Sequence, residues 1–112
     1  MTSFHIPVIE QRVMVYAGRE EWPRFLRGAA SAGADLSKMP KAAPIGKHCG
    51  WSFGPMLWFA PNARPRDIYH EVSHYMDNLM DDLGSQDTEF RAYLGEWVFD
   101  AILRWVAGQK ER

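Results

Sequence analysis

The spacing of apolar residues along the chain predicts a mixture of strands and helices. Residues 12–17 (RVMVYA) are nearly all apolar, which predicts a strand near the middle of a sheet. Residues 20–30 predict a helix with Pro23 in its first turn, because apolar side chains recur three and four residues apart: Trp22, Phe25, Leu26 and Ala29. A strand, a short break and a helix indicate an α/β or α+β domain.

The middle of the chain predicts a loop followed by a hairpin. Residues 31–46 contain two glycines and two prolines among small residues, so we expect a long loop there. Residues 47–53 and 55–60 are short, aromatic-rich runs on either side of Gly54. The Gly-Pro junction favours a tight turn, so residues 47–60 are predicted to form a hairpin.

Two longer amphipathic segments follow the hairpin. A helix is predicted for residues 65–83, between Pro65 and Gly84, with these apolar residues on one side: Ile68, Val72, Tyr75, Met76, Leu79, Met80 and Leu83. A last helix is predicted for residues 87–108, with this apolar stripe: Phe90, Leu94, Trp97, Val98, Ala101, Ile102 and Trp105. We therefore expect one α+β domain over residues 1–112, with a small three-to-four-stranded sheet packed on three helices.

Composition narrows the classes of protein. The chain has 13 Lys and Arg against 14 Asp and Glu, which argues against a nucleic-acid binder that relies on phosphate contacts. The longest apolar run, residues 56–60, is too short to span a membrane, and residues 1–11 lack the pattern of a signal peptide. The single Cys49 cannot form an internal disulfide, so we expect a cytoplasmic protein. Five Trp leave room for an exposed apolar patch and self-association.

The most specific chemical signal is the run His70-Glu71-Val72-Ser73-His74, an HExxH motif inside the predicted helix 65–83. Its two histidines lie one helical turn apart on the same face and can hold one zinc ion together. Glu71 can then take a proton from a metal-bound water. The alternative is a surface helix that carries these residues by chance.

A catalytic zinc site needs a third protein ligand besides water. Metzincins would place a glycine and a histidine at the positions of Asp77 and Met80, so that subclass is excluded. Glu89, Glu96 and Asp100 share one face of the last predicted helix. Glu89 and Glu96 are two turns apart and cannot reach the same ion, and Glu89 is preferred because a short loop precedes it. The alternative role for Glu89 is an acid that compensates the helix dipole.

A family resemblance rests on residues 70–93. Thr88-Glu89-Phe90-Arg91-Ala92-Tyr93 resembles the glutamate helix of gluzincin-type zinc metallopeptidases. The whole segment is similar to small zincin-like proteins, many of them encoded by phages and prophages, that carry HExxH and a Thr-Glu-x-x-Ala-Tyr segment. The resemblance implies a minimal zincin domain in which His70, His74 and Glu89 bind zinc and Glu71 is the general base.

The resemblance leaves the residues around the ligands less defined. Such families often orient a ligand histidine through the residue four after the glutamate, and here that residue is Tyr93 rather than a carboxylate. Asp77 shares the face of the two histidines and could accept an imidazole N–H, with solvent exposure as its alternative. The candidates for an oxyanion donor are Tyr69, Tyr75 and Tyr93, and His5 and His48 have no assigned role.

The expected function is that of a zinc-dependent peptidase acting on a peptide or protein substrate, without nucleic-acid or membrane partners. The substrate is expected to lie extended along a sheet edge, with residues 47–53 as the preferred strand. The alternative is a zincin-fold binding or assembly module of phage or prophage origin, in which zinc is structural or vestigial.

Overall fold

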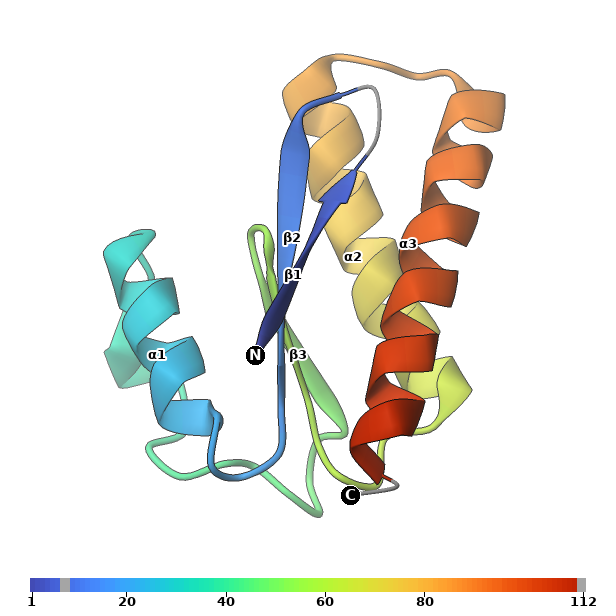
Figure 1. Cartoon of the computed structure of the whole chain (residues 1–112). Helices are drawn as coiled ribbons and strands as arrows, with labels where there is room; N and C mark the ends of the chain where they lie inside the picture. Colours follow the sequence, from blue (N-terminus) through green and yellow to red (C-terminus); the bar gives the residue numbers. More distant parts are fainter. Residues whose placement is uncertain (7–8, 111–112) are drawn as a thin grey trace.

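The computed structural model describes residues 1–6 and 9–110, so the predicted domain 1–112 is described apart from residues 7–8 and 111–112. The chain forms an α+β fold in which a four-stranded mixed sheet has one helix on one face and two helices on the other (Figure 1). Its elements, in chain order, are β1 (Thr2–Ile6), β2 (Gln11–Ala17), α1 (Trp22–Ser31), a 3-10 turn (Leu36–Lys38), β3 (Gly50–Phe53), β4 (Met56–Phe59), α2 (Pro65–Leu83) and α3 (Thr88–Lys110).

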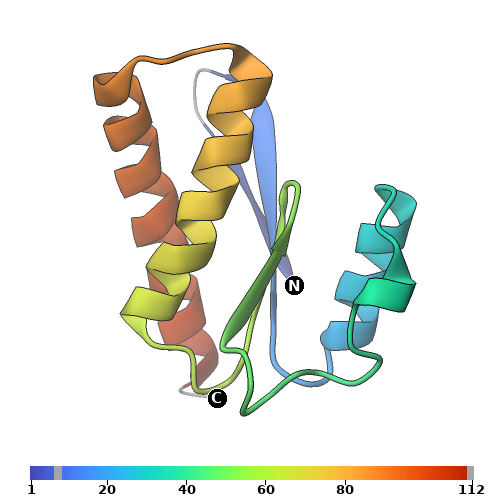
Figure 2. The same cartoon turned by 180° about the vertical axis from the view of Figure 1, so that it is seen from behind.

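The sheet has the strand order β1-β2-β4-β3. β2 pairs antiparallel with β1 and parallel with β4, while β3 pairs antiparallel with β4. The predicted inner strand at 12–17 is confirmed as β2, and the predicted hairpin is confirmed as β3 and β4 with shorter strands. Gly54 has a φ of 56°, which the first position of a primed two-residue turn requires. β3 is thereby held at one edge of the sheet, beside α2 (Figure 2).

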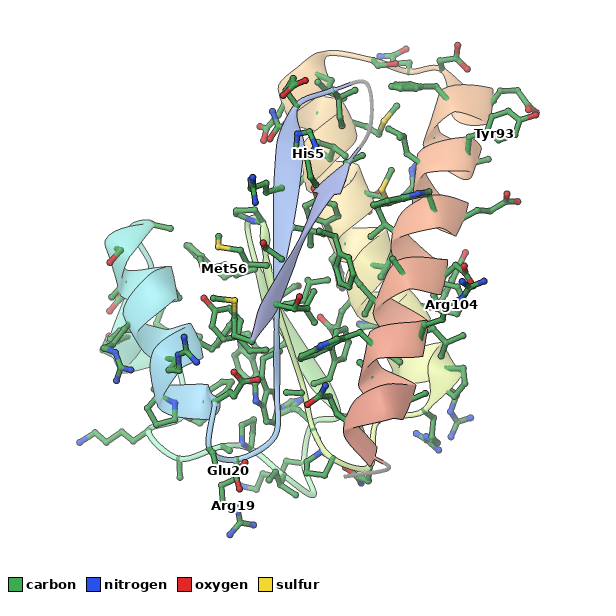
Figure 3. All side chains as sticks on the ribbon, viewed as in Figure 1. His5, Arg19, Glu20, Met56, Tyr93 and Arg104 are labelled. Carbon is green, nitrogen blue, oxygen red and sulfur yellow. The ribbon has the colours of Figure 1, made fainter. Side chains whose placement is uncertain are left out.

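The β4 strand is buried on both faces. Leu57 and Phe59 join the core beneath α2 and α3, while Met56 and Trp58 join the core beneath α1. Met56 lies between the sheet and α1 in Figure 3. Burial on both faces explains why β4 reads as an unbroken apolar run rather than an alternating one.

α1 covers the second core and anchors the long loop. Its buried residues are Trp22, Phe25 and Ala29, as the apolar spacing predicted, although the helix begins at Trp22 rather than at residue 20. The indole N–H of Trp22 donates to the carbonyl of Pro40 over 3.1 Å, which pins the loop to the helix. The predicted loop 31–46 is confirmed apart from its 3-10 turn, where Asp35 accepts from the backbone N–H of Ser37.

α2 has the predicted bounds, and α3 begins one residue later and ends two residues later than predicted. Asp67 starts α2 by accepting the backbone N–H of Arg64 over 2.8 Å, and Gly84 ends it with a φ of 66°. The prediction of a buried side chain is wrong for two residues. Leu83 and Trp97 are each 38% exposed, because Leu83 lies in the last turn of α2 and Trp97 on the outer flank of α3.

The β1 strand was not predicted. It is only five residues long, and its first four positions alternate between half-buried and exposed before the buried Ile6. In the part of the chain that the structure describes, no helix is both long and apolar enough to cross a membrane.

The two-sided core makes β4 the most sensitive strand to truncation. Leu57 is fully buried, so Leu57→Ala should lower the free energy of unfolding by about 3 kcal/mol in urea denaturation. Leu36→Ala is the matched control, because Leu36 is 41% exposed and its loss should change stability by less than about 0.5 kcal/mol. Equal effects of the two changes would contradict the assignment of β4 to the core.

Candidate functional site

The HExxH motif lies in α2, between β3 on one flank and α3 on the other. Helical spacing sends Glu71, His74 and Asn78 toward β3, where they line one groove. It sends Ser73 toward α3, where its carbonyl accepts from the Arg91 guanidinium over 3.4 Å. The motif therefore directs Glu71 and His74 toward the edge of the sheet, and Val72 and Ser73 toward α3.

The two motif histidines converge on one point. The Nε2 atoms of His70 and His74 are 3.2 Å apart, their ring planes are 86° apart, and both side chains are exposed. A tetrahedral zinc with Zn–N bonds near 2.05 Å would hold two nitrogens about 3.3 Å apart. The spacing of the two donors thus fits a shared zinc ion, and it also fits a hydrogen bond between the imidazoles.

Glu71 is the buried charged residue of the motif. It is 8% exposed and is the one charged or polar residue in the buried class among the described residues. Its side chain packs against Gly50 of β3, where an added Cβ would lie 2.7 Å from Glu71 Cγ. Glu71 therefore lies at the contact between α2 and β3, while the two imidazoles of the motif are exposed.

An open groove of about 340 Å³ joins the motif to the edge strand. Its lining comes from α2, from β3 and from the loop that precedes β3: His48, Gly50, Trp51, Ser52, Glu71, His74 and Asn78. The His48 ring meets Trp51 edge to face, with the ring centroids 5.1 Å apart. None of the β3 residues carried a chemical signal in the sequence, and only the pairing order of the strands brings them to α2.

The outer side of β3 has no strand partner among the described residues, because β3 is last in the strand order. Trp51 and Phe53 pack in the core on the α1 side, so Gly50 and Ser52, which alternate with them, face α2. An edge strand offers backbone N–H and C=O groups to an extended chain. Of the predicted peptide-binding strand 47–53, residues 50–53 form β3, and their outer edge has no strand partner among the described residues.

The two candidate carboxylate ligands of α3 lie at different levels along α2. Arg91 forms an ion pair with Asp77 and reaches Ser73, which sets the register of the two antiparallel helices. Glu89 precedes Arg91, so helical rise puts it about 3 Å further from the motif, and its side chain is exposed. Glu96 follows Arg91 by about 7.5 Å toward the motif. It lines the groove between the helices with Tyr69 and Ser73.

The structure brings His70 close to His74, and Glu71 lines one groove with His74, while Glu89 lines none of the grooves described around the motif. Within residues 1–6 and 9–110, no three His, Cys, Asp or Glu side chains are gathered closely enough to hold a metal ion. Asp77, which was a candidate to orient an imidazole, is directed toward Arg91 on α3. Asp100 pairs with Arg104 at 3.1 Å on the exposed side of α3.

The remaining candidates separate by exposure. Tyr93 is 70% exposed and points away from the sheet (Figure 3), and Tyr69 is 64% exposed and meets Phe99 edge to face. Tyr75 is 3% exposed and belongs to the core beneath α2 and α3. His5 lies on β1 with its Nε2 atom 3.3 Å from Glu10. Among the three tyrosines, none lines the groove that holds Glu71 and His74.

Two groups on α2 have shifted pKa values with clear causes. The pKa of the Asp67 carboxyl is lowered mainly by a hydrogen bond from the Arg64 side chain. A second hydrogen bond, from the backbone N–H of Arg64, lowers it further. These bonds hold the start of α2 one turn before His70. Burial raises the pKa of Tyr75 to about 12, because the phenolate form would lose its hydration.

No known protein family, curated protein or solved structure matches this chain. The chemistry of the site is therefore inferred from its own residues.

The raised pKa of Tyr75 predicts a loss of stability in alkali. The pKa of Tyr75 is about 12 in the folded protein and about 10 in the unfolded chain. The neutral hydroxyl therefore contributes fully to the free energy of unfolding below pH ~10, and this contribution is lost as pH rises toward ~12. Urea denaturation of Tyr75→Phe should show a shallower alkaline decline, by roughly 2 kcal/mol over that range. Tyr93→Phe, at an exposed position, should follow the wild type. Parallel declines for wild type and Tyr75→Phe would contradict burial of the hydroxyl.

Proposed function

We propose that this chain is a zinc-dependent peptidase with a minimal zincin-like fold. The observation that carries the proposal is the position of Glu71, which is enclosed beneath an edge strand and shares an open groove with His74. A peptidase of this kind needs a general base, a metal and a strand that aligns the substrate. The groove offers residues suited to each of these roles.

The two motif histidines supply part of the donor set that a zinc ion needs. His70 and His74 are exposed, and their Nε2 atoms have the separation that two ligands of one tetrahedral zinc would have. When bound, zinc would supply a Lewis acid for the scissile carbonyl and make water a stronger acid. His70 and His74 are therefore the proposed ligands on α2.

The chain's own groups would carry out the remaining steps. The free backbone edge of β3 would bind an extended peptide through main-chain hydrogen bonds. Glu71, at the level of Gly50, would accept a proton from the attacking water and pass it to the leaving amine. Trp51 and His48 at the groove wall would contact substrate side chains.

The third ligand is proposed to come from α3. The resemblance implies Glu89, while the register of the two helices puts Glu96 closer to the motif. Both are exposed carboxylates at the surface of α3, so their roles can be separated by substitution.

Metal content should depend on the motif histidines. Purified protein should hold about one zinc per chain by mass spectrometry, and His70→Ala or His74→Ala should weaken zinc binding by about 100-fold or more, because each removes a ligand. His5→Ala, on β1, is the matched control and should bind like the wild type. A wild-type protein without metal would contradict the proposal.

The same titration separates the two carboxylates. Weaker zinc binding in Glu89→Ala alone would support the assignment from the resemblance. Weaker binding in Glu96→Ala alone would support the assignment from the helix register.

Substitution of Glu71 should greatly reduce peptide cleavage without changing zinc binding. Glu71→Gln keeps the shape of the side chain but cannot accept a proton, so it should lower kcat by about 100-fold or more in a peptide-library digest. Its zinc content should stay at the wild-type level. Intact activity in this variant would contradict the role of Glu71. Zinc without cleavage in the wild type would favour the binding or assembly module instead.

A further inference from the structure

We infer that Gly50 is a positioning residue for Glu71: its missing side chain leaves the space beneath β3 that the carboxylate occupies. The effect on catalysis rests on the proposed function, whereas the steric relation between Gly50 and Glu71 is independent of it. Gly50 lies on β3 and Glu71 on α2, so the pair also records how closely the edge strand approaches the motif helix.

The space at Gly50 is filled by one side chain. An ideal Cβ at Gly50 would lie 2.7 Å from Glu71 Cγ, 3.3 Å from its Cδ and 3.3 Å from its Oε2. A Cβ–Cγ separation of 2.7 Å is well inside the contact distance of two carbon atoms. Any larger residue would therefore have to displace the carboxylate or move β3 away from α2.

Backbone conformation does not explain a glycine at this position. Gly50 is not among the glycines with a positive φ, which are Gly18, Gly33, Gly46, Gly54 and Gly84. In a strand, glycine is otherwise unfavourable compared with alanine, because it loses more backbone freedom on folding and has no side chain to pack. The need for space beside Glu71 is thus the physical reason that remains.

The side of β3 that faces α2 carries small residues throughout. On the side of β3 that faces α2, the residues are Gly50 and Ser52, whereas the side that faces α1 has the large Trp51 and Phe53. The small side chains let Glu71 lie directly against the edge strand along which the substrate is proposed to bind. A general base works only when held close to the proton it takes, and a misplacement near 1 Å can cost about 100-fold in rate.

A double-mutant cycle on stability tests the steric relation. Gly50→Ala should lower the urea midpoint in the wild type, because the new methyl group overlaps Glu71. In a Glu71→Ala background the same change should leave the midpoint unchanged or raise it, because the space is then free. An equal loss in both backgrounds would overturn the inference.

Two other glycines serve as controls. At Gly95 an added Cβ meets only Met76 Cγ at 3.8 Å, so Gly95→Ala should not lower the midpoint in either background. At Gly28 it would meet Met56 Sδ at 2.9 Å on the α1 side of the sheet. Gly28→Ala should therefore lower the midpoint equally with and without Glu71.

Measuring kcat together with zinc affinity separates a displaced Glu71 from a general disruption of the site. In Gly50→Ala, kcat for peptide cleavage should fall by about 100-fold with zinc affinity within about 3-fold of the wild type, because the histidines are untouched. Wild-type kcat in this variant would overturn the positioning role. If the wild-type protein cleaves no peptide, the proposed function fails, and the stability cycle alone still decides whether Gly50 holds the space for Glu71.

Discussion

The burial of β4 on both faces is the constraint on which the rest of the structure depends. Its four residues send Leu57 and Phe59 into one core and Met56 and Trp58 into the other, so both helical layers are packed against the same strand. The short turn at Gly54 then holds β3 antiparallel to β4 at the edge of the sheet. Because α2 packs over the same core, β3 and the motif helix are forced side by side.

The approach of β3 to α2 gives the HExxH motif its two different environments. The histidines on the outer side of α2 stay accessible to a ligand, while Glu71 is enclosed by the edge strand at a residue without a side chain. In the proposed peptidase, the exposed imidazoles would hold the metal and Glu71 would take the proton of the attacking water.

The ion pair between Arg91 and Asp77 marks the level at which α3 passes α2, and this level bears on which carboxylate of α3 could serve as a third ligand. The interval from His74 to Glu89 suggested that a short loop would fold the first turn of α3 back to the motif. α2 continues to Leu83 before the chain turns, and the contacts of Arg91 with Ser73 and Asp77 mark a register in which helical rise brings Glu96 nearer to the level of the motif than Glu89. Helix length and helix pairing together set this distance, and the sequence indicated only the first.

The sequence by itself determined the elements and the chemical identity of the motif. The apolar spacing predicted β2, α1, the hairpin, α2 and α3, because local periodicity and terminal residues such as Pro65 and Gly84 are read from neighbouring positions. It did not identify β1, because a segment of only five residues is too short for its alternation to be distinctive. Only the tertiary structure decided that Gly50 lies over Glu71 and that His48 and Trp51 border the same groove. Those contacts depend on the order in which strands pair, and that order is set by burial of the whole chain rather than by any local pattern.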